Sequence, residues 1–326
     1  MKHDWLPVIV GEDTNSSDYI IKRSQDLATS SYSLDEEDLV GVDGNRAKLE
    51  QWLGGDDMKC SLATLLGMGG IGKTALAANV YKKERAKFQC HAWVSISQTY
   101  SREDILRKVI NEVYKDEVSV PSEIATMDFT TLEETLKSYL ERNKYLIILD
   151  DVWTPKAFHD LSRALLCNGT GSRILITTRE GDVSRLASSE EHILKLEILP
   201  DRKAWDLFCM KSFPRENNNE CPEELEPLSK EIVGRCKGLP LAIVSIGSLL
   251  HTLETTMEDW RRINGQLGWE INNNQSLEHI KNVLQLSFIY LPTYLKSCFL
   301  YCSLFPEDYL SPKKACTVMD GRGVHH

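Results

Sequence analysis

The sequence contains no long apolar run. Its longest, residues 239–250, has about twelve positions interrupted by Ser245, Gly247 and Ser248, which is too short for a membrane-spanning helix. The first residues, 1–5, do not form the apolar segment of a secretory signal peptide. No stretch repeats with a period of 20–50 residues. These absences argue against an integral membrane protein and a solenoid.

Basic residues are also in deficit. The chain has 38 Lys and Arg against 48 Asp and Glu, a net charge of −10, and no long Lys/Arg run. Such a chain has no overall attraction to nucleic acid or to an anionic membrane. The nine cysteines include no C-x-x-C pair and no zinc-ligand pattern. We therefore expect buried free thiols, a reducing compartment and no nucleic-acid partner.

A phosphate-binding motif stands out against this background. Residues 67–74, GMGGIGKT, fit G-x-x-x-x-G-K-[ST], the P-loop. An apolar run at 62–66 precedes it and a helical stretch follows from Thr74, which is the strand–loop–helix context that the motif needs. The glycines allow backbone N–H groups to converge, Lys73 supplies a cation for phosphates, and the Thr74 hydroxyl can bind Mg²⁺. The alternative, a Gly-rich turn with a chance Lys-Thr pair, is disfavoured by these flanks.

Two acids end a second apolar strand, predicted at 145–151. A P-loop protein needs a carboxylate at the end of a buried strand to hold Mg²⁺, a role that Asp150 fits. Asp151 can orient or deprotonate a water that attacks the γ-phosphate, which makes it the candidate catalytic residue. The alternative is a pair of solvated acids that opens a loop.

Strands and helices alternate along the first two thirds of the chain. Strands are predicted at 62–66, 90–96, 145–151, 173–179 and 192–198, with helices at 45–53, 102–114 and 132–140, which indicates a parallel α/β sheet. From residue 201 the pattern becomes helical, with helices predicted at 201–211, 225–236, 240–250, 257–265, 276–288 and 294–302.

Two further residues lie where a ligand could reach them. Arg179 ends a predicted strand, and the carboxyl ends of parallel strands line the ligand crevice, so it can contact a γ-phosphate or be an ordinary surface arginine. Pro240 opens an apolar helix, where its simplest role is to start that helix.

Taken together, these motifs resemble the NB-ARC region of plant intracellular disease-resistance proteins of the NBS-LRR class. The matching blocks are 67–74, 88–97, 149–153, 171–179, 236–242 and 298–308, and they span roughly 40–314. Trp153 and the last block look like the branch whose members carry an N-terminal coiled coil. The resemblance implies an α/β P-loop NTPase sheet, a helical ARC subdomain and the start of a winged-helix subdomain.

The family implies an ADP/ATP switch in innate immunity, with Mg²⁺ as cofactor and the hypersensitive response as output. Transferred by position, the nucleotide would be held by Val40, Gly67, Gly69, Gly70, Ile71, Gly72, Lys73, Thr74, Ala75, Arg179, Pro240 and Leu241, and Mg²⁺ by Thr74 and Asp150. Arg179 would sense the γ-phosphate and Pro240 would pack on the adenine. Self-association or association with full-length receptors would follow, in the cytoplasm or peripherally at the plasma membrane.

The domain boundaries expected from the resemblance are a linker at 1–38, the P-loop domain at 39–199, the helical subdomain at 200–275, an incomplete winged helix at 276–314 and a divergent tail at 315–326. The family's coiled coil, Met-His-Asp motif and leucine-rich repeats are not found, so a truncated form is expected. Two alternatives stay open: a slow P-loop ATPase, and a non-functional or decoy fragment that modulates full-length receptors.

Overall fold

The computed structural model describes residues 39–55, 61–98, 100–115, 123–165, 171–213, 219–252 and 257–268, together with residues 288, 296 and 300. All of its helices and strands with stated bounds lie in one compact unit, Leu34–Lys296. The linker expected at 1–38, the winged-helix start at 276–314 and the tail at 315–326 fall outside these ranges, apart from the three isolated residues. So do the helices predicted at 276–288 and 294–302.

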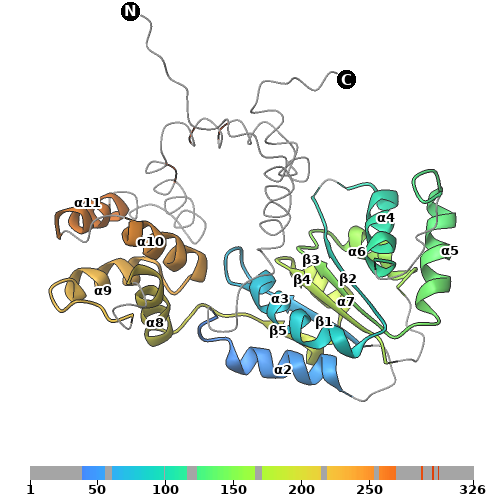
Figure 1. Ribbon diagram of the computed structural model, residues 1–326, viewed down its shortest axis with the longest axis horizontal. Coiled ribbons are helices and arrows are strands. Elements are labelled where there is room, and N and C mark those ends of the chain that lie inside the picture. Colours follow the sequence, from blue (N-terminus) through green and yellow to red (C-terminus); the bar gives the residue numbers. More distant parts are fainter. Residues whose placement is uncertain are drawn as a thin grey trace, which may run out of the picture. The chain divides into compact units, whose positions relative to one another are not determined.

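Five parallel strands form one sheet in the order β2-β3-β4-β1-β5 (Figure 1). They are β1 (Ser61–Leu66), β2 (Cys90–Ser95), β3 (Tyr145–Asp150), β4 (Arg173–Thr178) and β5 (Ile193–Lys195). All six residues of β3 and of β4 are buried, as expected for central strands covered on both faces. The predicted α/β class is thereby confirmed. Because β4 separates β1 from β3, the carboxyl end of β4 lies between the P-loop and the acidic pair.

Strand β5 is shorter than the sequence predicted. It covers three residues rather than 192–198, and a 3₁₀ turn, Glu190–His192, precedes it. The N–H of Leu196 still donates to the Leu66 carbonyl at 2.8 Å, but Leu199 instead donates to Gly238 of the helical part. The backbone thus leaves the sheet after residue 196 to join the next part of the fold.

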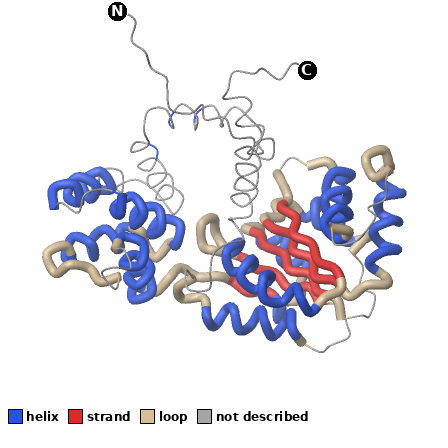
Figure 2. Tube along the Cα trace, in the orientation of Figure 1, coloured by secondary structure: helices blue, strands red, loops and turns tan. Residues whose placement is uncertain are grey.

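Helices cover both faces of the sheet (Figure 2). Helices α2 (Asp43–Gly54) and α3 (Lys73–Glu84) contact each other and β1, while α4 (Arg102–Val113), α5 (Phe129–Leu140), α6 (Pro155–Ser162) and α7 (Gly181–Ala187) share a core with the strands. Along β3, Tyr145, Ile147 and Leu149 belong to that core. Alternate residues of one strand point to the same face, so this face of the sheet carries the larger apolar layer.

Sequence periodicity did not reveal α6 and α7. Each has at most eight residues, which is too short for a helical repeat of apolar positions to stand out. Helix α6 nevertheless has a clear start, because the Thr154 side chain accepts a hydrogen bond from the N–H of Ala157 and Pro155 occupies the first helical position.

The helical part has its own core. It comprises α8 (Asp201–Ser212), α9 (Glu226–Arg235), α10 (Pro240–Thr252) and α11 (Met257–Gly268), close to the predicted ranges. Phe208 and Trp260 are both fully buried at its centre, with ring centroids 6.1 Å apart and nearly perpendicular. Ile71 of the P-loop belongs to this second core rather than to the sheet core. The P-loop is therefore tied to the helical part through a buried side chain.

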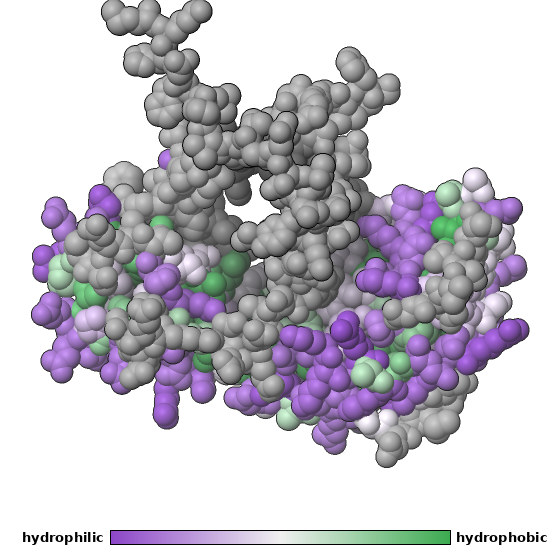
Figure 3. Space-filling model, in the orientation of Figure 1, coloured by the Kyte–Doolittle hydropathy of each residue, from purple (hydrophilic) through white to green (hydrophobic). Residues whose placement is uncertain are grey.

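Hydrophilic residues cover much of the visible face of the described part (Figure 3). Among the described residues, no helix has both the length and the apolar character that a bilayer crossing requires.

Candidate nucleotide-binding site

The P-loop joins β1 to α3 through a turn that only glycine adopts without strain. Gly70 and Gly72 have φ values of 75° and 99°, in the left-handed region. Gly72 is the N-cap of α3 and has no side chain with which to cap the helix. The first N–H groups of α3 are not used within the helix, and they carry the positive end of the helix dipole. This arrangement suits an anion.

Lys73 is folded back onto its own loop. Its side chain is buried, and Nζ donates to the carbonyls of Gly67 at 2.9 Å and Met68 at 3.1 Å. Burial lowers the pKa of Lys73, and the nearby charge of Arg179 lowers it further, while Asp151 and Asp150 oppose the shift. An incoming phosphate would add negative charge beside this buried cation and oppose the lowering of its pKa.

Asp150 lies at the centre of a hydroxyl network. One of its carboxylate oxygens accepts from Thr177 Oγ1 at 2.6 Å and from Thr74 Oγ1 at 3.0 Å. The residue is only 6% exposed, and burial raises the pKa of its carboxyl above the ordinary value, against the lowering effect of both hydroxyls. The structure thus brings together the two residues predicted to bind a metal, from α3 and from β3.

Thr177 is a site residue that the sequence did not single out. Its hydroxyl donates to Asp150 and accepts the backbone N–H of Asp151 at 2.8 Å. It lies on β4, between β1 and β3, so it spans the gap between the P-loop and the acidic pair. The only available signal was its place at the end of a predicted strand beside Arg179.

Arg179 and Asp151 form an ion pair at the sheet edge. Arg179 Nη2 lies 3.3 Å from Asp151 Oδ2, and their side chains are 41% and 27% exposed. Both residues therefore lie at the same edge as the P-loop, as their predicted strand ends required. The sequence could place each at a strand end but could not pair them.

Helix α10 meets the P-loop directly. The N–H of Leu241 donates to the Gly70 carbonyl at 3.1 Å, which brings the predicted residues Pro240 and Leu241 to the phosphate loop. Val40 and Met68 pack, half-buried, against the core that contains Ile71. The Ile71 side chain points into that core, so only its backbone is left for a ligand. Ala75 lies half-buried in the first turn of α3.

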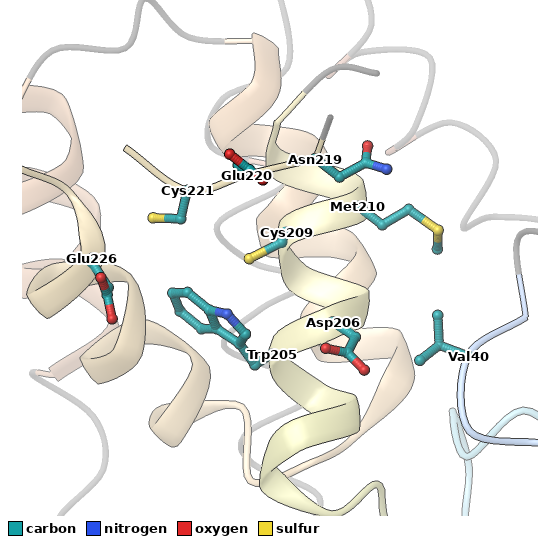
Figure 4. A pocket seen from close by; sticks show the side chains of 9 residues that line it. All are labelled: Val40, Trp205, Asp206, Cys209, Met210, Asn219, Glu220, Cys221 and Glu226. Atoms are coloured by element: carbon teal, nitrogen blue, oxygen red, sulfur yellow. The ribbon is translucent and has the colours of Figure 1, made fainter. Parts of the chain in front are cut away.

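Val40 also borders a pocket of about 560 Å³ in the helical part. Figure 4 shows Trp205, Asp206, Cys209 and Met210 on one helix, α8. Trp205 and Cys209 point to one side of it, and Asp206 and Met210 point towards the side of Val40. The other residues that line the pocket are Asn219, Glu220, Cys221 and Glu226. The free thiols of Cys209 and Cys221 agree with the expected reduced cysteines, and burial raises the pKa of Cys209 to about 12.

The donor set at Asp150 suits Mg²⁺. Within the described ranges, no three His, Cys, Asp or Glu side chains gather into a metal-binding group. Mg²⁺ does not need such a cage, because it commonly binds through one or two carboxylates with water and substrate phosphates. The carboxylate of Asp150 and the hydroxyl of Thr74, 3.0 Å apart, are hard oxygen donors of that kind. The Gly70–Gly72 turn and Lys73 would hold the phosphates.

Comparison with known proteins gives a consistent family. The NB-ARC domain matches residues 42–218. The disease resistance protein RPM1 of Arabidopsis thaliana is 39% identical over 88% of this chain and 31% of its own length. Disease resistance RPP13-like protein 4 of the same plant is 36% identical over 87% of this chain and 33% of its own length.

Among solved structures, a signal transduction ATPase with numerous domains from Pyrococcus horikoshii, which carries a tetratricopeptide repeat sensor, aligns with a TM-score of 0.47. The identity is 16%, over 82% of this chain and 35% of that one. The present chain spans about a third of the length of the curated relatives it matches. By its domain match and by the extent of its likeness to these plant proteins, the chain belongs to the NB-ARC family.

Proposed function

We propose that this chain is the nucleotide-binding module of a plant immune receptor, a switch that exchanges ADP for ATP with Mg²⁺ and thereby controls defence signalling. Family membership and the names of the relatives support the class of protein. The site supports the chemistry, because a glycine turn, a buried lysine, a hydroxyl and a carboxylate converge at one edge of the sheet.

One observation carries the proposal: Thr74 of the P-loop helix donates directly to Asp150 of β3. The same pair of oxygens can exchange this mutual contact for a shared Mg²⁺. Lys73, now bonded to the loop's carbonyls, can turn to phosphate oxygens. These are the residues that would hold the cofactor, and the metal would supply charge neutralisation at the phosphates.

A switch also needs a link between the phosphate site and another part of the fold. The Leu241–Gly70 hydrogen bond and the burial of Ile71 in the helical core supply two such links. A change in the P-loop backbone would therefore shift the position of the first turn of α10. This supports a signalling role over one in which nucleotide is merely stored.

The test is the nucleotide content of the purified chain, measured after denaturation, beside the variants Lys73→Ala and Lys82→Ala. Lys82 lies on the same helix with an exposed side chain, and it serves as the control. We expect bound ADP or ATP in the wild type and in Lys82→Ala, and none in Lys73→Ala. Circular dichroism checks that all three are folded. Equal nucleotide content in Lys73→Ala would contradict the P-loop assignment.

The second candidate is a slow ATPase, favoured by the position of Asp151 directly after the metal-binding carboxylate. The Asp151 carboxylate is paired with Arg179, whose Nη2 lies 3.3 Å from Oδ2. We propose that turnover is slow, because this ion pair must separate before Asp151 can act on a water molecule, and that binding carries the function. Multiple-turnover phosphate release that Asp151→Asn abolishes would favour the enzyme instead.

We further propose a cytoplasmic location, including the membrane periphery, and association with itself or with full-length receptors. The free cysteines of the described part support a reducing compartment. Sedimentation of the chain with ADP and with a non-hydrolysable ATP analogue would detect nucleotide-dependent self-association.

A further inference from the structure

The guanidinium of Arg179 is held by three groups. Asp151 Oδ2 lies 3.3 Å from Nη2, and the Trp153 ring centroid lies 4.5 Å from Cζ. A Cβ atom built on Gly69 would meet Nη1 at 3.3 Å, so the cation lies directly against the P-loop. An anion, an aromatic face and the phosphate loop thus lie against one side chain, which is 41% exposed.

The backbone of Asp151 is held in the left-handed region, which residues other than glycine rarely adopt. Its φ is 57°, and its N–H donates to Thr177 Oγ1 at 2.8 Å. The next N–H, that of Val152, donates to the Thr177 carbonyl at 2.9 Å. This turn therefore sets the positions of both Asp151 and Trp153 relative to the end of β4, from which Arg179 emerges.

The two partners of the guanidinium differ in kind. A carboxylate competes with a phosphate for the same N–H donors, because both are anions that accept from arginine. An aromatic face does not compete, since it binds the flat side of the cation and leaves the N–H edge available. The cation can therefore change anions while it stays on the ring.

We propose that Trp153 is the positioning residue for Arg179 and that Asp151 is the anion which Arg179 gives up for a γ-phosphate. This inference rests on the proposed nucleotide switch and names the residues that set its preference for triphosphate. Trp153 keeps the guanidinium beside Gly69, and Asp151 forms an ion pair with it when no γ-phosphate is present. When Arg179 binds the γ-phosphate instead, the Asp151 carboxylate loses this ion pair and becomes available.

The test uses titration calorimetry of the full chain with Mg²⁺ and either ADP or a non-hydrolysable ATP analogue. Trp153→Leu removes the ring face, and we expect about two- to fivefold weaker binding of the ATP analogue, with ADP binding nearly unchanged. Trp153→Phe keeps a ring face, so it should fall between Leu and the wild type. In the Arg179→Ala background, Trp153→Leu should no longer change the ratio of the two affinities.

Asp151→Asn tests the other partner. Asparagine tolerates the left-handed backbone and removes the competing charge, so the ATP analogue should bind about two- to fivefold more tightly, as expected for a partly exposed ion pair. Circular dichroism establishes that each variant is folded, and if Trp153→Leu is not, the Phe and Asn variants still decide.

Some results would overturn the positioning role while leaving the switch intact. These are an equal loss of both nucleotides in Trp153→Leu, an unchanged effect of that substitution without Arg179, or weaker analogue binding in Asp151→Asn. If the wild-type chain binds neither nucleotide, the proposed function fails as well, so the two failures are distinguishable.

Discussion

The N–H of Leu241 donates to the carbonyl of Gly70, which joins the first turn of α10 to the P-loop backbone. The contact is tight, because a Cβ atom built on Gly70 would lie 2.8 Å from Leu241 Cβ. Gly70 also has a φ of 75°. Both the backbone conformation and the approach of α10 therefore require glycine at this position.

Gly70→Ala should destabilise the chain and abolish nucleotide retention. Strain in the left-handed region costs about 1–3 kcal/mol, and the close contact with Leu241 adds to it. Urea unfolding gives the stability, and the nucleotide content of the purified variant gives retention. Gly44→Ala is the control, because Gly44 lies in helix α2 and a Cβ there meets nothing within 4 Å. Equal stabilities for the two variants would contradict the proposed tight junction.

Thr177→Val should disturb the acidic pair without changing the side-chain volume. It removes one of the two hydroxyl donors to Asp150, since Thr74 still donates there, and it removes the acceptor for the partly buried N–H of Asp151. Leaving that N–H without its partner costs about 1–3 kcal/mol in the free energy of unfolding. Nucleotide binding in Mg²⁺ should weaken more than binding in EDTA.

The matched control is Thr177→Ser, which restores the hydroxyl and should recover most of both effects. If Ser and Val behave alike, the hydroxyl is not what matters at residue 177.

Asp150→Asn should stabilise the nucleotide-free chain at neutral pH while impairing Mg²⁺-dependent binding. Burial is the chief cause that raises the pKa of Asp150 above its ordinary value of 3.8. The Asp150 carboxyl therefore binds a proton more tightly in the folded state than in the unfolded state. The contribution of Asp150 to stability is full below the unfolded pKa and is lost as pH rises through the folded one.

Asparagine has no charge to desolvate and keeps an oxygen for Thr74 and Thr177. We expect a gain of about 0.5–2 kcal/mol at pH 7, because the substitution removes a buried charge from a site that serves binding at a cost in stability. The gain should shrink as the pH is lowered through the raised pKa of Asp150 in the folded state, because the protonated carboxyl also carries no charge. Urea unfolding at several pH values measures this difference, and a gain that grows on acidification would refute the sign.

Much of this site could be predicted because each motif lies at the end of a periodic element. The P-loop follows an apolar run and Asp150 ends another, and parallel strands bring such ends to one edge. Thr177 escaped notice because a threonine in a β-branched strand looks like an ordinary strand residue. The pairing of Arg179 with Asp151 and Trp153 depends on strand order, which local sequence does not encode. Likewise Ile71 reads as a loop residue, and only the tertiary fold assigns its side chain to the helical core.

Gly238→Ala tests a second contact between the sheet domain and the helical part, that of Gly238 with Leu199. Gly238 has a φ of 68°, and a Cβ there would collide with the backbone oxygen of Leu199. The two segments are held by the Leu199 N–H, which donates to the Gly238 carbonyl at 2.8 Å. Because backbone on both sides must move, strain and overpacking add, and we expect a loss of about 3 kcal/mol or more.

Gly234→Ala is the control for this variant, since Gly234 lies in helix α9 and a Cβ there has open space. It should be neutral or slightly stabilising, because alanine favours the helix. If Gly238 serves only to join the two parts, Gly238→Ala should lower the denaturant midpoint and also weaken ADP and the ATP analogue equally, since Pro240 and Leu241 follow it at the P-loop. A change in the ratio of the two affinities would instead mean that the contact at Gly238 responds to the γ-phosphate. We otherwise assign the discrimination between ADP and the ATP analogue to the contacts of Arg179.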